Sequence, residues 1–401
     1  MLTRFIIAAL LAIPVSASAQ SLSEAVQRAW ERAGLDQVAS AGQQDAAAAR
    51  AVADAWFAAA PTVGLAQRDD RFNRDRGLRE RELELALPLW RPGQRSAAQA
   101  VATVAASEVA ATLAERRLAL AGEVRSQAWR LAAARAEAEV RAIRLASAEQ
   151  IESDVARRVV AGDMARTDLL LAKAELMTVR AEHLAATSRV QQTLQAWRGL
   201  TGLTGLDEFS DPPLESPVAE RTQAYSLAHP QHVLADAVVA RARAELDLAR
   251  DSGPAPELSL GWQQARESAG AAANNSLRIG LRLPLAGETR SGPRIAAANL
   301  ALVRAETDRQ RLAFELEGRE LEAQLALESA RQTLQLAEER GHATAERRQL
   351  LQRAFDLGEL ALSELLRAQA LDNEAQLQMA LARIEVGLRQ SVLNQARGVL
   401  P

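Results

Sequence analysis

The sequence presents the same order of elements twice, about 196 residues apart, and this internal duplication constrains the fold more than any other feature. The two best-matched segments are VARRVVAGDMARTDLLLAKA, starting at Val155, and LLQRAFDLGELALSELLRAQA, starting at Leu350. They align Gly162 with Gly358. A single repeat of this length indicates a duplicated architectural unit, not an array of short repeats. Each unit is predicted to contain a helix, two strands, a very long helix and a returning helix.

The N-terminus has the layout of a cleavable secretory signal over residues 1–19. Arg4 precedes the apolar run FIIAALLAIPV, and Ala17-Ser18-Ala19 supplies the small residues of a cleavage site, so we expect the mature chain to begin at Gln20. A membrane anchor is the alternative, but the apolar run is shorter than the roughly 20 residues that a spanning helix needs. The chain has no cysteine, so we expect no disulfide, no thiolate metal site and no lipidated N-terminal cysteine.

Composition argues against several classes of function. The formal net charge is -3 with 25% charged residues, which gives no basic face for a nucleic acid. We find no nucleophile with its base and no phosphate-binding loop. The four histidines are scattered along the sequence, at His183, His229, His232 and His342. Only His229 and His232 are neighbours, and two ligands separated by a proline make a poor metal site. We therefore expect no enzyme, no metal site and no cofactor.

Four segments alternate apolar and charged residues with a period of two, which predicts strands at about 62–68, 80–90, 257–264 and 276–285. Four strands cannot form a sandwich, so one apolar face stays uncovered. In an exported protein lipid can cover that face, provided that the strands close into a barrel. Barrels start at about eight strands, so the chain should oligomerise. The predicted lipid face consists of Leu83, Leu85, Leu87, Leu258, Leu260, Trp262, Leu277, Ile279, Leu281 and Leu283.

Two stretches without proline, 94–161 and 294–357, predict helices on the order of 100 Å long at about 1.5 Å per residue. Return helices are predicted over 163–198 and 359–397. The helix that precedes the strands, 21 to about 60 in the first unit, could stack end to end on the return helix, so that the two together match the length of the long helix. Antiparallel coiled-coil hairpins are the expected product.

The boundary between the two units falls in a segment dense in glycine, proline and acidic residues, TGLTGLDEFSDPPLESPVAE. Such a composition is typical of a linker or a small surface segment. We therefore divide the mature chain into a first repeat over 20–202, a linker or equatorial segment over 203–221, and a second repeat over 222–401.

The duplicated order of elements, the strand ends LALPLWRPGQR and LRLPLAGETRSGPR, and the glycine turn followed by Leu-Leu together resemble the TolC family of outer-membrane efflux proteins. The resemblance covers the whole mature chain. It implies a mostly α-helical fold with a small transmembrane β part. Three chains would each give four strands to a twelve-stranded β-barrel, and their helical hairpins would form an α-helical barrel in the periplasm.

The resemblance also implies a function, that of a passive exit duct in the cell outer membrane. Such a duct works with a periplasmic adaptor (membrane fusion) protein and an inner-membrane pump. The compact chain resembles the branch that serves metal-cation pumps of the resistance-nodulation-division type, although drugs, solvents or secreted proteins are other possible cargoes. The alternatives are a periplasmic coiled-coil adaptor or structural spacer, and the outer-membrane component of type I secretion.

By the same resemblance, the hairpin tips carry the adaptor contacts. The matching positions are Val160, Gly162, Thr167, Asp356, Gly358 and Ser363. A second interpretation is that the glycines only allow two helices to reverse direction. Arg157 and Arg353 recur one turn before these glycines and could pair across the two hairpins; the alternative is that each is a solvated surface arginine.

Acidic residues just after each turn, Asp168 and Glu364, match the periplasmic aperture of the family. Three copies of each would form a negative ring at a narrow mouth. The alternative is that these acids only stabilise the N-termini of their helices, where the helix dipole favours negative charge. Arg367 stands where the family's type member has a second acid, so the gating cannot be transferred in detail. Trp56, Phe57 and Trp90 at the helix-strand junctions fit either an aromatic belt or core packing.

Overall fold

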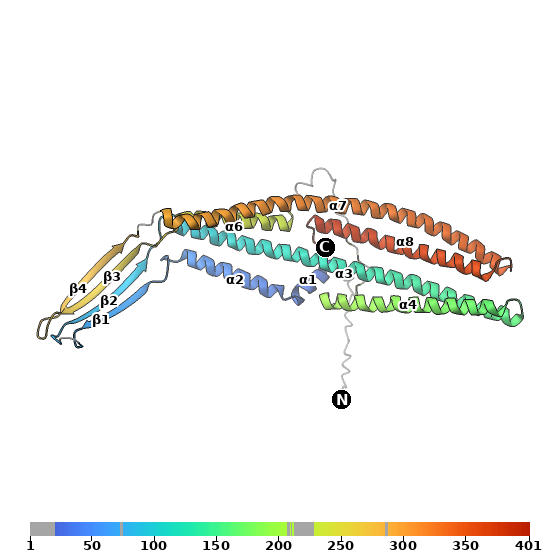
Figure 1. Cartoon of the computed structure of the whole chain (residues 1–401), viewed down its shortest axis with the longest axis horizontal. Coiled ribbons are helices and arrows are strands. Elements are labelled where there is room, and N and C mark those ends of the chain that lie inside the picture. The colour runs from blue at the N-terminus through green and yellow to red at the C-terminus, as the bar shows by residue number, and fades with distance from the viewer. Residues whose placement is uncertain (1–20, 73–74, 207–208, 210, 212–227, 285–287) are drawn as a thin grey trace, which may run out of the picture.

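In the computed structural model, the chain is a long, slightly curved bundle of helices with one four-stranded sheet projecting from its end (Figure 1). The structure describes residues 21–72, 75–206, 209, 211, 228–284 and 288–401. The predicted signal peptide, 1–19, and most of the predicted linker, 203–221, lie outside the described residues.

The two halves contain corresponding elements. The first half comprises α1 (Leu22–Arg32), α2 (Leu35–Asp54), β1 (Thr62–Asp69), β2 (Arg79–Pro88), α3 (Gln94–Ala161) and α4 (Arg166–Thr201). The second half comprises α6 (Pro230–Asp251), β3 (Glu257–Arg266), β4 (Asn274–Arg282), α7 (Glu288–Asp356) and α8 (Leu362–Ala396). The rods α3 and α7 have 68 and 69 residues, which gives each a length on the order of 100 Å.

Two differences from the predicted helix boundaries exceed a few residues. The single helix expected over 21–60 is instead α1 and α2, because Gly34 adopts the left-handed conformation (φ 68°) between them. The indole of Trp30 donates a 2.7 Å hydrogen bond to Asp36 across this break. In the second half, α7 begins at Glu288, before the predicted start at 294. Pro293 lies in the second turn of α7, where it removes one backbone donor without ending the helix.

Each rod is flanked by shorter helices placed one after the other. Figure 1 shows α2 and α1 along the sheet-proximal part of α3 and α4 along the rest, with α6 and α8 placed in the same way along α7. The guanidinium Nε of Arg32 donates a 2.9 Å hydrogen bond to the carbonyl of Gly199, which joins the end of α1 to that of α4. This is the end-to-end stacking that the helix lengths predict.

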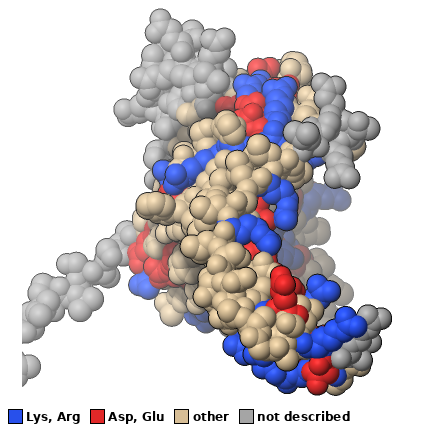
Figure 2. All heavy atoms as spheres, turned by 90° about the vertical axis from the view of Figure 1, so that its left-hand side faces the viewer, with Lys and Arg blue, Asp and Glu red and all other residues tan. Residues whose placement is uncertain are grey.

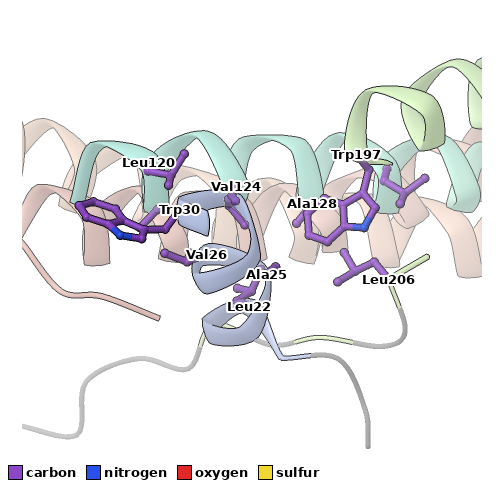
Figure 3. Packing of buried hydrophobic residues seen from close by; sticks show 12 residues of the cluster. Leu22, Ala25, Val26, Trp30, Leu120, Val124, Ala128, Trp197 and Leu206 are labelled. Carbon is purple, nitrogen blue, oxygen red and sulfur yellow. The ribbon is translucent and has the colours of Figure 1, made fainter. Parts of the chain in front are cut away.

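The largest buried cluster lies where these short helices meet the middle of α3 (Figure 3). Val26 and Trp30 of α1 pack onto the helical turns around Val124, which has no exposed surface. Trp197, near the end of α4, is also fully buried, and its indole donates a 2.9 Å hydrogen bond to the carbonyl of Gly205. The cluster therefore fixes the junction between the sheet-proximal and distal parts of the rod.

A polar cluster is buried beside it. Arg125 of α3 pairs with Asp211, at 2.7 Å from Nε to Oδ2, and both side chains are almost wholly buried. Its Nη1 also donates to Oε1 of Gln395 (2.8 Å) and to the carbonyl of Val399 (2.9 Å). The amide of Asn394 donates to Asp211 at 3.0 Å. One arginine thus joins α3, the segment beyond α4 and the end of α8.

Candidate functional site

The sheet has the order β1-β2-β3-β4, and all of its neighbouring strands are antiparallel. The register brings nine of the ten predicted lipid-face residues onto one face, together with Val63 and Leu65 of β1; Leu283 lies one residue beyond β4. Three rows cross the sheet. They are Leu87–Leu258–Leu281, Val63–Leu85–Leu260–Ile279 and Leu65–Leu83–Trp262–Leu277.

These apolar side chains are open to the surroundings. Leu277 is 85% exposed and Ile279 is 78% exposed. No helix makes more than a marginal contact with the sheet within the described residues, and Figure 1 shows the strands extending beyond the helices. A face of this size left in water would be unusual, because soluble proteins rarely expose contiguous large apolar patches.

The opposite face of the sheet is polar and carries paired charges. Arg282 lies 2.8 Å from Glu257, and Arg68 lies 3.6 Å from Glu80. Arg278 reaches across β3 to Glu82 at 3.2 Å. Gly261, the cross-strand partner of Arg278 on β3, has no side chain to block that path. The two faces therefore suit two different environments, one apolar and one aqueous.

The two outer strands leave the sheet open. β1 pairs only with β2, and β4 pairs only with β3, so each has one edge of unpaired backbone N–H and C=O groups in the described chain. Such edges template pairing with another chain. In an apolar environment unpaired backbone groups cost several kcal/mol each, so an open four-stranded sheet is not stable in lipid.

At the other end of the rod, each hairpin reverses direction at a glycine. Gly162 follows α3 with φ 88°, and Gly358 follows α7 with φ 79°. Residues after each glycine close the turn, with 2.9 Å bonds from the Asp163 N–H to the Arg158 carbonyl and from the Glu359 N–H to the Ala354 carbonyl. A Cβ at either glycine would meet nothing within 4 Å, so backbone conformation alone requires these glycines.

The two tips pack on one another through a buried apolar cluster. Val155 and Leu365 have no exposed surface, and Phe355 is 5% exposed among them. Leu365 belongs to the Leu-Leu pair that follows the second glycine turn in the sequence. The cluster holds the two hairpins of one chain together at the end farthest from the sheet.

Of the two interpretations of Arg157, pairing across the hairpins is not observed in the structure. Arg157 pairs with Asp154 on its own helix. Arg158 makes the connection instead: its Nη1 donates to the Phe355 carbonyl (3.2 Å), its guanidinium carbon lies 5.0 Å from the Phe355 ring centroid, and its Nη2 lies 3.7 Å from Asp356. The duplication could not reveal Arg158, because alanine occupies the matching position in the second repeat.

The residues predicted to contact an adaptor lie on the surface of the tips. All six are exposed, and Val160 is 90% exposed; the set is Val160, Gly162, Thr167, Asp356, Gly358 and Ser363. Leu357, which lies between Asp356 and Gly358, is 75% exposed. The tips therefore expose apolar side chains together with the backbone of the glycine turns.

The predicted aperture residues lie in the first turns of the return helices. Asp168 is in the first turn of α4, and Glu364 is in the first turn of α8. Arg367 lies 3.6 Å from Glu364 on the same helix, and both side chains are exposed. Arg367 thus neutralises part of the charge of Glu364, although an exposed pair of this kind adds little stability.

The junction aromatics and the histidines named in the sequence lie in different surroundings. Trp90 donates a 3.0 Å hydrogen bond to the Ala55 carbonyl at the helix-strand junction, whereas Trp56 is 88% exposed. His229 caps the start of α6, and the Nδ1 of His232 lies 3.1 Å from Asp236 on the same helix. No group of three or more metal-binding side chains occurs among the residues that the structure describes.

Comparison with known proteins gave results only at the level of structure. No protein-family model matches the chain, and no curated protein matches its sequence. CusC, known from structures that show conformational changes accompanying folding and transmembrane channel formation, has a TM-score of 0.77 at 13% identity, over 95% of this chain and 93% of that chain. VceC, an outer membrane protein of Vibrio cholerae, has a TM-score of 0.74 at 15% identity, and the match covers 94% of this chain and 96% of the VceC chain.

A third solved structure, the MtrE outer membrane channel of Neisseria gonorrhoeae in its open state, has a TM-score of 0.74 at 14% identity. The match covers 94% of this chain and 89% of the MtrE chain. The matches extend over nearly the whole chain, including the sheet and both hairpins. The protein therefore has the outer-membrane channel fold that was predicted from its resemblance to the TolC family.

Proposed function

We propose that the protein is an outer-membrane exit duct, a passive conduit from the periplasm to the exterior. The observation that carries this proposal is the uncovered apolar face of the sheet, formed by three cross-strand rows and backed by a face of paired charges. Lipid outside and water inside a barrel satisfy both faces at once.

Three copies of the chain would close the barrel. The edge of β1 on one copy would pair with the edge of β4 on the next, so four strands per chain would give twelve. The helices support the same assembly. α3 contains an 18-residue stretch of mean hydropathy 1.3, of which 11% is buried within the single chain. The rod as a whole is far longer than a bilayer is thick, so we do not assign this stretch to the membrane. Neighbouring copies of the chain would cover it instead.

The hairpin tips are the proposed docking site for a periplasmic adaptor. Val160 and Leu357 offer exposed apolar surface there, and Gly162 and Gly358 leave turn backbone groups accessible. The adaptor would join the duct to an inner-membrane pump, which would supply the energy for transport, since the sequence contains no phosphate-binding loop of its own.

Asp168 and Glu364 are proposed to line the periplasmic aperture. Three copies of each would place carboxylates around a narrow mouth, where they would attract cations and repel one another. The pairing of Glu364 with Arg367 moderates that repulsion at one of the two positions.

The test is to locate, size and reconstitute the mature chain. We expect it in the outer-membrane fraction, as a trimeric rod on the order of 140 Å long by electron microscopy. We also expect the trimer to give discrete conductance steps in a planar lipid bilayer. A soluble periplasmic monomer would overturn the barrel, the trimer and the duct together. A trimer in the outer membrane that never conducts would overturn the duct alone.

A further inference from the structure

The outward face of the sheet changes from apolar to basic beyond the last row of hydrophobic residues. In the register, that row is followed by Gln67–Arg81–Gln264–Asn275 and then by Asp69–Arg79–Arg266. Side chains alternate between the two faces of a strand, so Arg79 and Arg81 lie on the same face as Leu83, and Arg266 lies on the same face as Trp262. Three arginines therefore border the apolar face at the end where the strand-connecting turns lie.

These arginines differ from those on the polar face. Arg68, Arg278 and Arg282 each pair with a glutamate. The side chains of Arg79 and Arg81, by contrast, have no hydrogen bond or ion pair with any described residue. The Nε of Arg266 donates only to the Ser268 carbonyl, at 3.1 Å.

Two of the three arginines face each other directly. Arg79 and Arg266 are cross-strand partners in the register. Like charges at opposed positions destabilise a sheet. Asp69 is the nearest acid in that row, and it accepts from Gln67 and from the Arg71 N–H instead. The pair of arginines thus lacks a counter-charge from the described part of the chain.

The strand ends that carry these arginines are held in place by the turns. The Ala269 N–H, after β3, donates a 2.8 Å hydrogen bond to the Arg76 carbonyl, before β2. Gly77 (φ 91°) packs so closely against Ala269 that a Cβ there would clash with its backbone. Figure 2, which looks onto the sheet end of the rod, shows Arg side chains gathered at the lower end of the view, with some Asp and Glu among them, beside a broad uncharged surface.

We propose that Arg79, Arg81 and Arg266 bind the phosphate groups of an anionic lipid headgroup in the outer leaflet of the membrane. This inference rests on the proposed function, which places the apolar rows in lipid. Arg81 lies two residues beyond Leu83, about 7 Å along the strand, so its guanidinium reaches the headgroup level when acyl chains cover the leucines. A lipid, unlike free phosphate, engages both the arginines and the adjoining apolar rows.

The guanidinium group suits this ligand. Its planar fork of N–H donors binds phosphate oxygens in a bidentate manner, and it keeps its charge at any physiological pH. Two phosphates on one headgroup would match the spread of the three arginines over β2 and β3 and remove the repulsion between Arg79 and Arg266. A glycolipid with two phosphates is therefore the preferred ligand class.

The test measures lipid retention by the detergent-purified trimer with native mass spectrometry. The probe is bisphosphorylated lipid A, compared with the same glycolipid stripped of both phosphates. We expect the wild-type trimer to retain the phosphorylated form at least about tenfold better, and the R79Q/R81Q/R266Q variant to lose that preference. The matched control is R68Q/R278Q/R282Q, which removes the same charge from the polar face and should keep the preference.

The outcomes separate this inference from the proposed function. If wild-type trimers form and conduct but retain both lipids equally, the lipid site is absent while the duct stands. Equal losses in the two triple variants would also overturn the site, since total charge alone would then account for binding. Displacement of the lipid by millimolar inorganic phosphate would show that the apolar rows contribute nothing. If the wild-type chain forms no outer-membrane trimer, the proposed function fails before the lipid comparison begins.

Discussion

Arg125 and Asp211, which are 86 residues apart in the chain, form a buried ion pair in the middle of the rod. Their side chains are 3% and 4% exposed. The same guanidinium binds the Gln395 side chain and the Val399 carbonyl, so four separate hydrogen bonds converge on Arg125. The pair fixes the waist of the molecule, where the two repeats and the C-terminal segment meet.

Arg125→Leu should therefore be strongly destabilising. It leaves the Asp211 carboxylate buried without its cation, and breaking a buried pair in this way costs about 3–5 kcal/mol. Urea denaturation followed by helical circular dichroism measures the change in the free energy of unfolding. Arg68→Leu, at an exposed arginine on the sheet, is the control and should change the free energy by well under about 1 kcal/mol. Similar losses in the two variants would contradict the role assigned to the buried pair.

Gly387→Ala should loosen the contact between α8 and α3. A Cβ at this position would overlap the ring of Trp129, and that ring is held by a 2.7 Å hydrogen bond from its indole to Ser391. Overpacking of this kind costs about 1–3 kcal/mol. Gly199→Ala is the matched control, because it is helical and a Cβ there meets nothing within 4 Å; it should stabilise by about 0.5–1 kcal/mol. Thermal unfolding of both variants should give shifts of opposite sign.

His229 should make the fold less stable in acid. Burial lowers the pKa of His229 below 6.5, and its Nδ1 accepts the Gln231 N–H, which a protonated ring could not do. The nearby charges of Arg319 and His232 lower the pKa further, whereas Glu115 and the Gln395 backbone act in the opposite direction.

Because the folded pKa lies below the unfolded value, the unfolded chain binds the proton first as the pH falls. The contribution of His229 is complete above pH 6.5 and is lost progressively between 6.5 and the lower folded pKa. His229→Asn keeps a capping side chain but cannot titrate. Melting temperatures at about pH 7.5 and 5.5 should thus fall less in the variant than in the wild type. Equal falls would show that His229 does not contribute to the acid sensitivity.

Leu277→Arg and Ser276→Arg test the two faces of β4 with neighbouring residues. Leu277 is 85% exposed on the apolar face, where arginine costs about 2–4 kcal/mol at the bilayer midplane. Ser276 is on the polar face, where the same substitution meets water. The yield of trimer in the outer-membrane fraction should drop severalfold for Leu277→Arg and remain near wild type for Ser276→Arg. The reverse order would invert the assignment of the faces.

Arg158→Gln should weaken the contact between the two tips. It removes the hydrogen bond to the Phe355 carbonyl and the contact with the Phe355 ring, together about 1 kcal/mol for a half-exposed side chain. Amide hydrogen exchange over residues 355–362 should speed up by about fivefold. Arg157→Gln, which removes only a bond within α3, should leave exchange at the second tip unchanged.

Local sequence signals predicted the strands, the long rods and the turns. Alternation from Leu83 to Leu87 identifies a strand and its apolar face because a strand has a period of two. The absence of proline from 94–161 marks one uninterrupted helix, and Gly162 marks its end. Each of these signals needs only neighbouring residues, so the architecture could be predicted where sequence comparison found no relative.

Contacts between distant residues could not be predicted in this way. Asp211 falls in the segment assigned to the linker, and nothing in its neighbourhood indicates a partner 86 residues away. Arg158 differs from Arg157 only in the direction of its side chain around the helix. The break at Gly34 is spanned by the hydrogen bond from Trp30 to Asp36, a contact that the helical pattern of this segment does not indicate.

The open edges of β1 and β4 have a genetic consequence. If every barrel needs three intact chains, a chain whose β4 cannot pair would spoil each assembly that it enters. In a cell that makes equal amounts of intact and edge-defective chains, about one trimer in eight would contain only intact copies. Mutations at these edges should accordingly act as dominant alleles, whereas mutations that unfold the chain before assembly should be recessive.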